Sequence, residues 1–169
     1  MLKRAALSTS ILGLAGLALV LSGCDKPKER PVDQPTADAV VQARPPGPAW
    51  AANYMGKGLR ELFPETGDCV GNTETAETRY ADGVSIVGWG ADNTTHAGVG
   101  RVVLVDEGYR VVGAGETGLP RPDVPAARPD ITDPNTGWRA IATIPVGAVE
   151  AYGVTNDGRG ACKLGYIKF

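Results

Sequence analysis

Histidine, serine and cysteine are scarce in this chain of 169 residues, and that scarcity excludes several kinds of catalytic site. The chain has one histidine, His96, and beyond residue 24 its one serine is Ser85. A serine nucleophile needs a positioned base beside it, and zinc sites use several His or Cys ligands, so neither chemistry is supported. The sequence therefore predicts no catalytic residues, no metal and no cofactor.

Long hydrophobic runs are also missing, apart from one short run near the N-terminus. Residues 11–21 are apolar, and a helix of that length rises about 16 Å, roughly half of a ~30 Å hydrocarbon core. Lys3 and Arg4 come before the run, so it suits the hydrophobic part of a secretory signal better than a membrane span. An ordinary signal peptide and an uncleaved anchor that begins at Ala5 are the alternatives.

The end of this run carries a sequence motif. Residues 21–24 read LSGC, which resembles the lipobox of bacterial lipoproteins. The resemblance implies that residues 1–23 are a signal peptide, that the Cys24 thiol takes a diacylglyceryl group, and that the new amino terminus is acylated. Two or three acyl chains anchor a protein stably in a lipid bilayer. It also implies that Asp25 retains the protein in the inner membrane, on its periplasmic face, if the host is Gram-negative.

Neither sign of charge dominates the sequence. Without residues 1–24, which carry Lys3 and Arg4, the 17 basic residues fall to 15 against 19 acidic ones, a net charge of about −4 with histidine neutral. Nucleic-acid binding requires clustered basic side chains, and this sequence has no such cluster. No nucleic acid is therefore expected as a partner.

The number of cysteines agrees with export. Of the three, Cys24 is assigned to the lipid, which leaves Cys69 and Cys162. An even pair in an oxidising compartment favours a disulfide. Such a bond would close a long loop, worth about 4.5 kcal/mol in the chain-entropy model. Two buried or reactive free thiols are the alternative.

Prolines and charges dominate residues 24–48, which contain six prolines and show no amphipathic period. A segment of this composition cannot bury a hydrophobic face, so we expect a disordered, partly polyproline-like tether. At ~3.1 Å per residue it would reach up to ~75 Å from the membrane.

A helical spacing follows the tether. Trp50 and Tyr54 lie four residues apart, the pattern continues to residue 63, and Pro64 ends it. Residues 49–66 are therefore predicted to be a short helix and its connection, packed on the domain that follows. The alternative is a helix that binds a partner or a membrane surface, but its charges form no basic face.

From residue 67 to residue 169 the pattern is typical of strands. Residues such as Val, Ile, Thr, Tyr and Trp alternate with Gly, Asn, Asp and Pro turns at short intervals. Several strands without a long helix between them predict a mainly β domain, an antiparallel sandwich. We expect strands over residues 83–92 and 137–145, and a hairpin over residues 100–116 that turns at residues 106–108. Residues 148–167 are expected to form a last pair of strands that turns at NDGRG (156–160). In the strand over residues 83–92, Val84, Ile86 and Gly88 fall on one face.

Five motifs run in order through this region: GWGAD (88–92), VVLVDEGYRVVGAG (102–115), GLPRPDVPAARPD (118–130), TGWRA (136–140) and VEAYGVTNDGR (149–159). Together they resemble an immunoglobulin-like β-sandwich module of exported bacterial proteins. Glu107 before Gly108, and also Gly153 and Thr155, depart from the usual pattern. The resemblance implies a non-catalytic accessory or recognition module, and it implies no particular ligand.

Six residues are candidate ligand contacts: Trp89, Asp92, His96, Arg121, Asp123 and Trp138. The two tryptophans each follow a glycine and could form a platform that stacks on a sugar, although a buried Trp is the usual core of a sandwich. Asp92 and His96 flank a polar loop, where ligands often bind. Arg121 and Asp123 could instead pair with each other, with Asp123 capping a turn.

Loop carboxylates leave two further possibilities open. Asp123, Asp130 and Glu116 could serve an enzyme that acts on envelope polysaccharide, if they meet in one cleft. Asp130, Asp133 and Asn135 could offer oxygen ligands to Ca²⁺, but their spacing does not match an EF-hand loop. Acidic residues at turns more often bond to their own backbone.

The sequence thus predicts a membrane-anchored envelope lipoprotein whose folded part is a binding or accessory module for a protein or glycan partner. The acylated Cys24 makes the lipid bilayer its first partner. The polysaccharide enzyme and a structural spacer are the alternatives.

Overall fold

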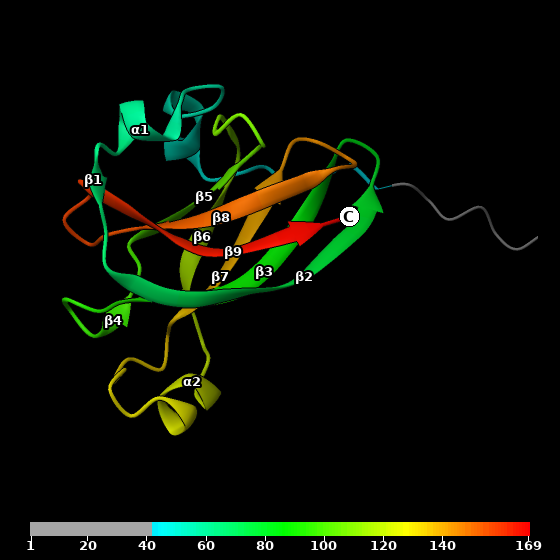
Figure 1. The fold of residues 1–169 in the computed structure, drawn as a ribbon. Helices are drawn as coiled ribbons and strands as arrows, with labels where there is room; N and C mark the ends of the chain where they lie inside the picture. Colours follow the sequence, from blue (N-terminus) through cyan, green and yellow to red (C-terminus); the bar gives the residue numbers. More distant parts are fainter. Residues whose placement is uncertain (1–41) are drawn as a thin grey trace, which may run out of the picture. The chain divides into compact units, whose positions relative to one another are not determined.

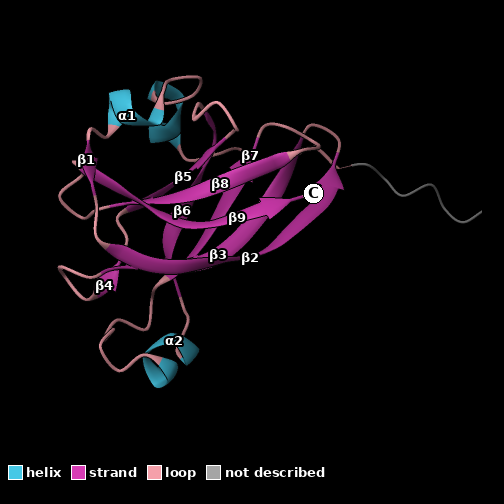
Figure 2. Ribbon diagram, viewed as in Figure 1, coloured by secondary structure: helices cyan, strands magenta, loops and turns pink. Residues whose placement is uncertain are grey.

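Strands account for about half of residues 42–169, the part of the chain that the computed structural model describes, and helices for far less (Figure 2). The predicted mainly β fold is confirmed. The predicted signal peptide, Cys24, Asp25 and the first part of the tether lie outside the described residues. No helix within residues 42–169 is long and apolar enough to cross a lipid bilayer.

The expected strands are found close to their predicted bounds, because runs rich in Val, Ile, Tyr and Trp between Gly, Asn, Asp and Pro turns are a strong local signal. The strands are β1 (Glu65–Thr66), β2 (Cys69–Tyr80), β3 (Gly83–Asp92), β4 (Ala97–Gly98), β5 (Arg101–Val105), β6 (Val111–Leu119), β7 (Gly137–Ala142), β8 (Ala148–Val154) and β9 (Gly160–Lys168). The helical segments are the 3₁₀-helix η1 (Ala49–Asn53) and the short helices α1 (Leu59–Leu62) and α2 (Asp123–Ala127).

Hydrogen bonds join the strands into one strongly curled sheet of order β1-β9-β8-β5-β6-β7-β3-β2, with β4 paired to β3 (Figure 1). Neighbours along this order are antiparallel, except that β1 runs parallel to β9. An immunoglobulin-like sandwich consists of two separate sheets, whereas this hydrogen-bonded order is continuous. That finer prediction is not confirmed.

The curl brings β2 back against β9, so that the first long strand and the last lie side by side (Figure 1). A Cβ atom on Gly165 of β9 would lie 2.8 Å from the backbone nitrogen of Thr73 on β2, so this close approach requires glycine. The predicted disulfide between Cys69 and Cys162 is confirmed at the same seam, with Cα atoms 5.8 Å apart. The disulfide therefore links the two ends of the curled sheet.

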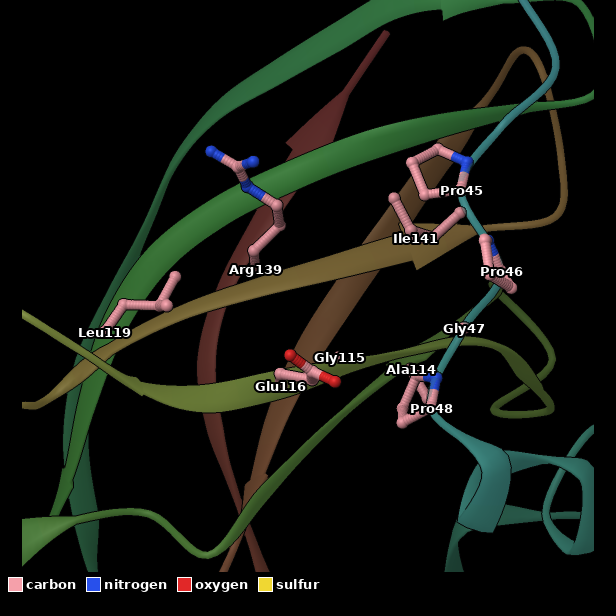
Figure 3. A pocket seen from close by; sticks show the side chains of 10 residues that line it. All are labelled: Pro45, Pro46, Gly47, Pro48, Ala114, Gly115, Glu116, Leu119, Arg139 and Ile141. Carbon is pink, nitrogen blue, oxygen red and sulfur yellow. The ribbon is translucent and has the colours of Figure 1, made fainter.

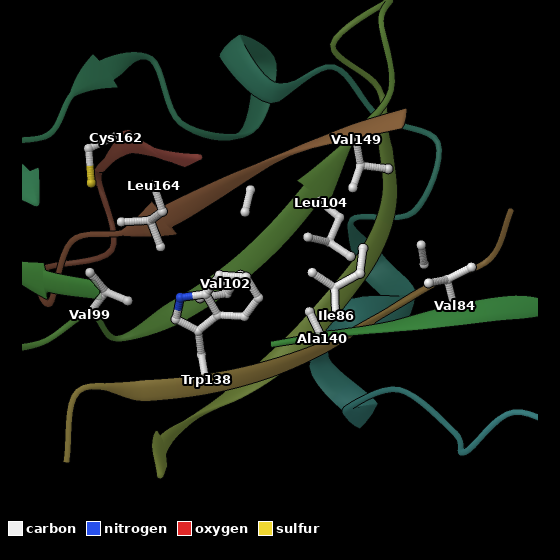
Figure 4. Packing of buried hydrophobic residues seen from close by; sticks show 12 residues of the cluster. Val84, Ile86, Val99, Val102, Leu104, Trp138, Ala140, Val149, Cys162 and Leu164 are labelled. Atoms are coloured by element: carbon white, nitrogen blue, oxygen red, sulfur yellow. The ribbon is translucent and has the colours of Figure 1, made fainter. Parts of the chain in front are cut away.

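The inner face of the sheet holds the main hydrophobic core (Figure 4). Trp138 of β7 lies in this core with 1% of its surface exposed. Val84 and Ile86 of β3 project into the same core, as their alternation predicted. Leu104 of β5 and Leu164 of β9 pack on them from the other side of the curl.

Residues 49–63 cover the part of the outer face that belongs to β5 and β8. The side chains of Leu59 and Phe63 are buried there against Val103 and Val105 of β5. The segment therefore packs on the domain as predicted, and it forms a second hydrophobic layer outside the sheet.

The prediction of one helix over residues 49–63 is wrong, because the segment contains two separate helical turns, η1 and α1. Between them Gly56 takes a φ of 77°, a left-handed conformation that ends a helix. The Gly56 N–H donates to the Val111 carbonyl at 2.8 Å instead of to a helical partner. Pairing with the sheet replaces the middle of the predicted helix.

The last residues of the predicted tether, 42–48, lie along the sheet. Gln42 forms a single bridge with Tyr80 at the end of β2. The Arg44 side chain lies 3.1 Å from the Asp82 carboxylate, in the turn between β2 and β3. This stretch then crosses toward β6 and β7 before η1 begins.

Candidate functional site

The two tryptophan candidates face opposite sides of the sheet and form no shared platform. Gly88 of β3 is the register partner of Trp138 on β7, so the next residue, Trp89, points the other way. Trp138 is buried in the inner core, which corrects its candidacy as a ligand contact. Trp89 is half-buried on the outer face, where it packs with Val124 and Ile131.

Asp92 is buried and holds two loops together. Its Oδ1 accepts a hydrogen bond from the Thr94 N–H at 2.9 Å, and its Oδ2 accepts one from the Asn156 N–H at 3.0 Å. These backbone partners occupy the carboxylate, so its role is to fix the loops rather than to meet a ligand. His96 is exposed at the same loop, with a φ of 55° and its N–H bonded to the Asp92 carbonyl.

Arg121 and Asp123 pair with each other, as the sequence suggested, but the start of α2, at Pro122, has no side-chain cap hydrogen bond. The guanidinium lies 2.7 Å from Asp123 and 2.9 Å from Glu74 of β2. The hydrogen bond from Arg121 lowers the pKa of Asp123. Because both carboxylates bind the guanidinium, Arg121 ties the loop before α2 to β2 and has little capacity for a ligand.

The other loop carboxylates also have local partners. Asp130 pairs with Arg128 at 2.8 Å, and the hydrogen bond from Arg128 lowers the pKa of Asp130. Asp133 accepts the Gly98 N–H at 3.0 Å, and this bond lowers its pKa. Within residues 42–169, no group of three His, Cys, Asp or Glu side chains could hold a metal ion.

A groove of about 400 Å³ lies on the outer face of β6 and β7 (Figure 3). Residues 45–48 form one wall, Ala114 and Ile141 form the floor, and Leu119 stands at the far end of β6. We call this hollow the proline groove. Proline has no N–H and cannot extend the sheet, so the segment crosses the strands and leaves open space beside it.

Two opposite charges stand in the proline groove. Glu116 of β6 and Arg139 of β7 are register partners, yet within residues 42–169 they form no ion pair with each other or with a third residue. Figure 3 shows the Arg139 side chain extending away from Glu116. Both charges are therefore available to a ligand that lies across the floor.

Of the groove residues, only Glu116 was among the sequence candidates, as a carboxylate of the alternative enzyme. The alternation in GWRAIA does place Arg139 and Ile141 on the face opposite Trp138, so these two could have been assigned to the outer face. Their neighbours Glu116 and the prolines come from distant parts of the sequence. No protein-family model, no curated protein and no solved structure matches this chain. The site must therefore be interpreted from its own geometry.

Proposed function

We propose that this chain is a lipid-anchored lipoprotein of the bacterial cell envelope, and that its folded part is a non-catalytic module that binds a protein partner in the proline groove. The LSGC motif supports the anchor at Cys24, and Asp25 supports the inner membrane if the host is Gram-negative. The disulfide between Cys69 and Cys162 supports export, because disulfides persist in oxidising compartments.

The open groove is the observation that carries the binding role. Its floor is apolar, and one cation and one anion stand over it without an ion pair in the described part of the chain. Its described lining includes no aromatic ring that could stack on a sugar. An extended protein segment, with a polar backbone and apolar side chains, fits this lining better than a glycan does.

The resemblance to immunoglobulin-like accessory modules belongs to this proposal, since such modules bind and do not catalyse. The alternative enzyme requires carboxylates that meet in one cleft. Asp123 and Asp130 each pair with their own arginine, and Glu116 stands in the separate groove. This arrangement favours the binding module.

The anchor is tested by the variant Cys24→Ala. We expect the variant to escape lipid attachment and to be released from membranes or retained unprocessed, as judged by sedimentation and mass spectrometry. If it still sediments with membranes at the normal processed mass, the lipoprotein assignment is wrong.

The groove is tested by charge reversal in the full-length protein. After crosslinking in cells, we expect Arg139→Glu and Glu116→Lys to reduce capture of the main partner at least about tenfold, the loss of one charge-assisted contact. Arg79→Glu on exposed β2 is the matched control and should capture the same partner normally. Equal capture by all three variants would refute the groove as the binding surface.

A further inference from the structure

A second pocket, of about 210 Å³, lies between the β5–β6 turn, the start of β8 and the end of β9. Tyr109 and Tyr166 line it with 52% and 54% of their surfaces exposed, unusually high for aromatic side chains. Asp106, Glu107 and Glu150 also line it. The pocket shares no lining residue with the proline groove.

The turn holds Tyr109 in a fixed position. Asp106 Oδ1 accepts the N–H groups of Gly108 and Arg110, each at 2.9 Å, and the Tyr109 N–H donates to the Asp106 carbonyl at 2.9 Å. Tyr109 has a φ of 56°, which is uncommon for a bulky residue. These bonds fix the backbone from which the exposed ring projects, so less conformational entropy is lost when the ring binds a partner.

The pocket lining is negatively charged. It contains three carboxylates and no basic residue. Glu150 is neutralised by Lys163 at 2.6 Å and also accepts the Tyr152 hydroxyl at 3.0 Å. Asp106 and Glu107 form no ion pair within residues 42–169, so two negative charges remain uncompensated beside the exposed rings.

We propose that this tyrosine pocket binds a lysine or arginine side chain of a protein partner. The ring faces of Tyr109 and Tyr166 attract a cation, and the Glu107 carboxylate binds it by charge-assisted hydrogen bonds. Asp106, whose Oδ1 already accepts two backbone N–H groups, adds its negative charge. A neutral sugar would gain ring stacking but nothing from the charge, and an anionic lipid surface would be repelled. Charge complementarity therefore selects a basic side chain.

The test measures binding of defined probes to the full-length protein by nuclear magnetic resonance titration. The probes are a penta-lysine peptide with blocked ends, the same peptide with every side chain acetylated, and maltopentaose. We expect penta-lysine to shift the Tyr109 and Tyr166 signals and to bind at least about tenfold more tightly than the acetylated peptide, since acetylation removes the charge. Added salt should weaken the interaction.

Paired variants locate the site. Tyr166→Leu should bind penta-lysine about three- to fivefold more weakly, whereas Tyr166→Phe, which keeps the ring, should bind normally. Glu107→Gln should weaken binding, whereas Glu61→Gln on exposed α1 changes the net charge equally and should have little effect. These positions are exposed, and a thermal melt of each variant verifies its fold.

Three outcomes would overturn the proposal. The first is that all of these variants bind penta-lysine equally. The second is that maltopentaose binds more tightly than penta-lysine and is affected by the same variants. The third is that the protein binds phosphatidylcholine vesicles and that Tyr166→Leu abolishes this binding. The proline groove is tested separately, because Arg139→Ala should leave penta-lysine binding unchanged. A negative result for one site therefore does not contradict the proposal for the other.

Discussion

The outer face of the curled sheet has two regions that differ in what covers them. Over β5 and β8, residues 49–63 bring large side chains such as Phe63, and the strands beneath them carry valines. Over β6 and β7, residues 45–48 bring only three prolines and a glycine, and a groove remains. The first region is a hydrophobic layer and the second an open surface.

The difference follows from the covering residues. Leu59 and Phe63 can reach into the sheet and exclude water, which stabilises the fold by burying apolar area. Proline rings are short and donate no hydrogen bond, so residues 45–48 touch the strands without filling the space beside them. The covered surface contributes to stability, whereas the partly covered surface retains the open groove that we propose as a binding site.

The strongest way to break this comparison is to truncate Phe63, which is 2% exposed. Phe63→Ala should lower the free energy of unfolding by about 3–5 kcal/mol, because it leaves a cavity in the covered layer. Leu119→Ala at the edge of the groove is the control and should change it by less than about 0.5 kcal/mol. Urea denaturation measures both, and equal losses would contradict the distinction between the two regions.

Removal of the disulfide should affect both regions together. The double variant Cys69→Ala with Cys162→Ala should have a free energy of unfolding lower by about 2–5 kcal/mol, since the disulfide constrains the unfolded chain. Native-state hydrogen exchange should show faster exchange in β5 and in β7 alike. If exchange became faster in only one of the two regions, the disulfide would stabilise only that region.

A smaller effect is expected for Arg101, whose guanidinium lies 5.2 Å from the ring centre of Trp50 and donates to the Tyr54 hydroxyl at 2.8 Å. Arg101→Ala should lower the free energy of unfolding by about 1 kcal/mol, because it removes a contact between β5 and the segment that covers it. Arg139→Ala in the groove should lower the free energy of unfolding by less than about 0.5 kcal/mol. Thermal melts of the two variants measure this difference in stability. A larger loss of stability in Arg139→Ala than in Arg101→Ala would contradict the distinction between the two regions.

The smallest predicted effect is a change in stability with pH that comes from Tyr152. Burial, with Glu150 beside the hydroxyl, raises the pKa of Tyr152 to about 12, whereas tyrosine in an unfolded chain titrates near 10. Between these values the unfolded chain loses its proton first, so stability falls as the pH rises. The loss should reach at most about 1 kcal/mol because the group is partly exposed.

Tyr152→Phe provides the control for that measurement. The difference in unfolding free energy between the two proteins, measured in urea below and above the unfolded pKa, isolates the Tyr152 contribution from other tyrosines and from lysines. Parallel pH profiles for the two proteins would show that Tyr152 titrates as in the unfolded chain.

The inner face of the fold could be predicted because its signal is local. Val84 and Ile86 lie two residues apart, and in a strand this spacing places both on one face, which here is the face of the main core. β2 was not predicted as a separate strand, since NTETAETR has no apolar alternation. It is held by pairing with β3 and by its contact with β9, which are not visible in the local sequence.

The candidate site was harder to predict for the same reason. Trp89 and Trp138 have similar sequence surroundings, and only the pairing of β3 with β7 shows that they face opposite sides. The proline groove combines Glu116 and Arg139, which the pairing of β6 with β7 brings together, with residues 45–48, which lie outside the strands. A single sequence carries no register information of that kind.

The disulfide has a consequence for proteolysis. Cys69 and Cys162 are joined across a separation of 93 residues, so a protease that cuts one loop between them releases no fragment. The nicked protein would migrate as one band in a non-reducing gel and as two after reduction. A single cut would therefore leave both proposed binding surfaces attached to whatever holds the N-terminal segment.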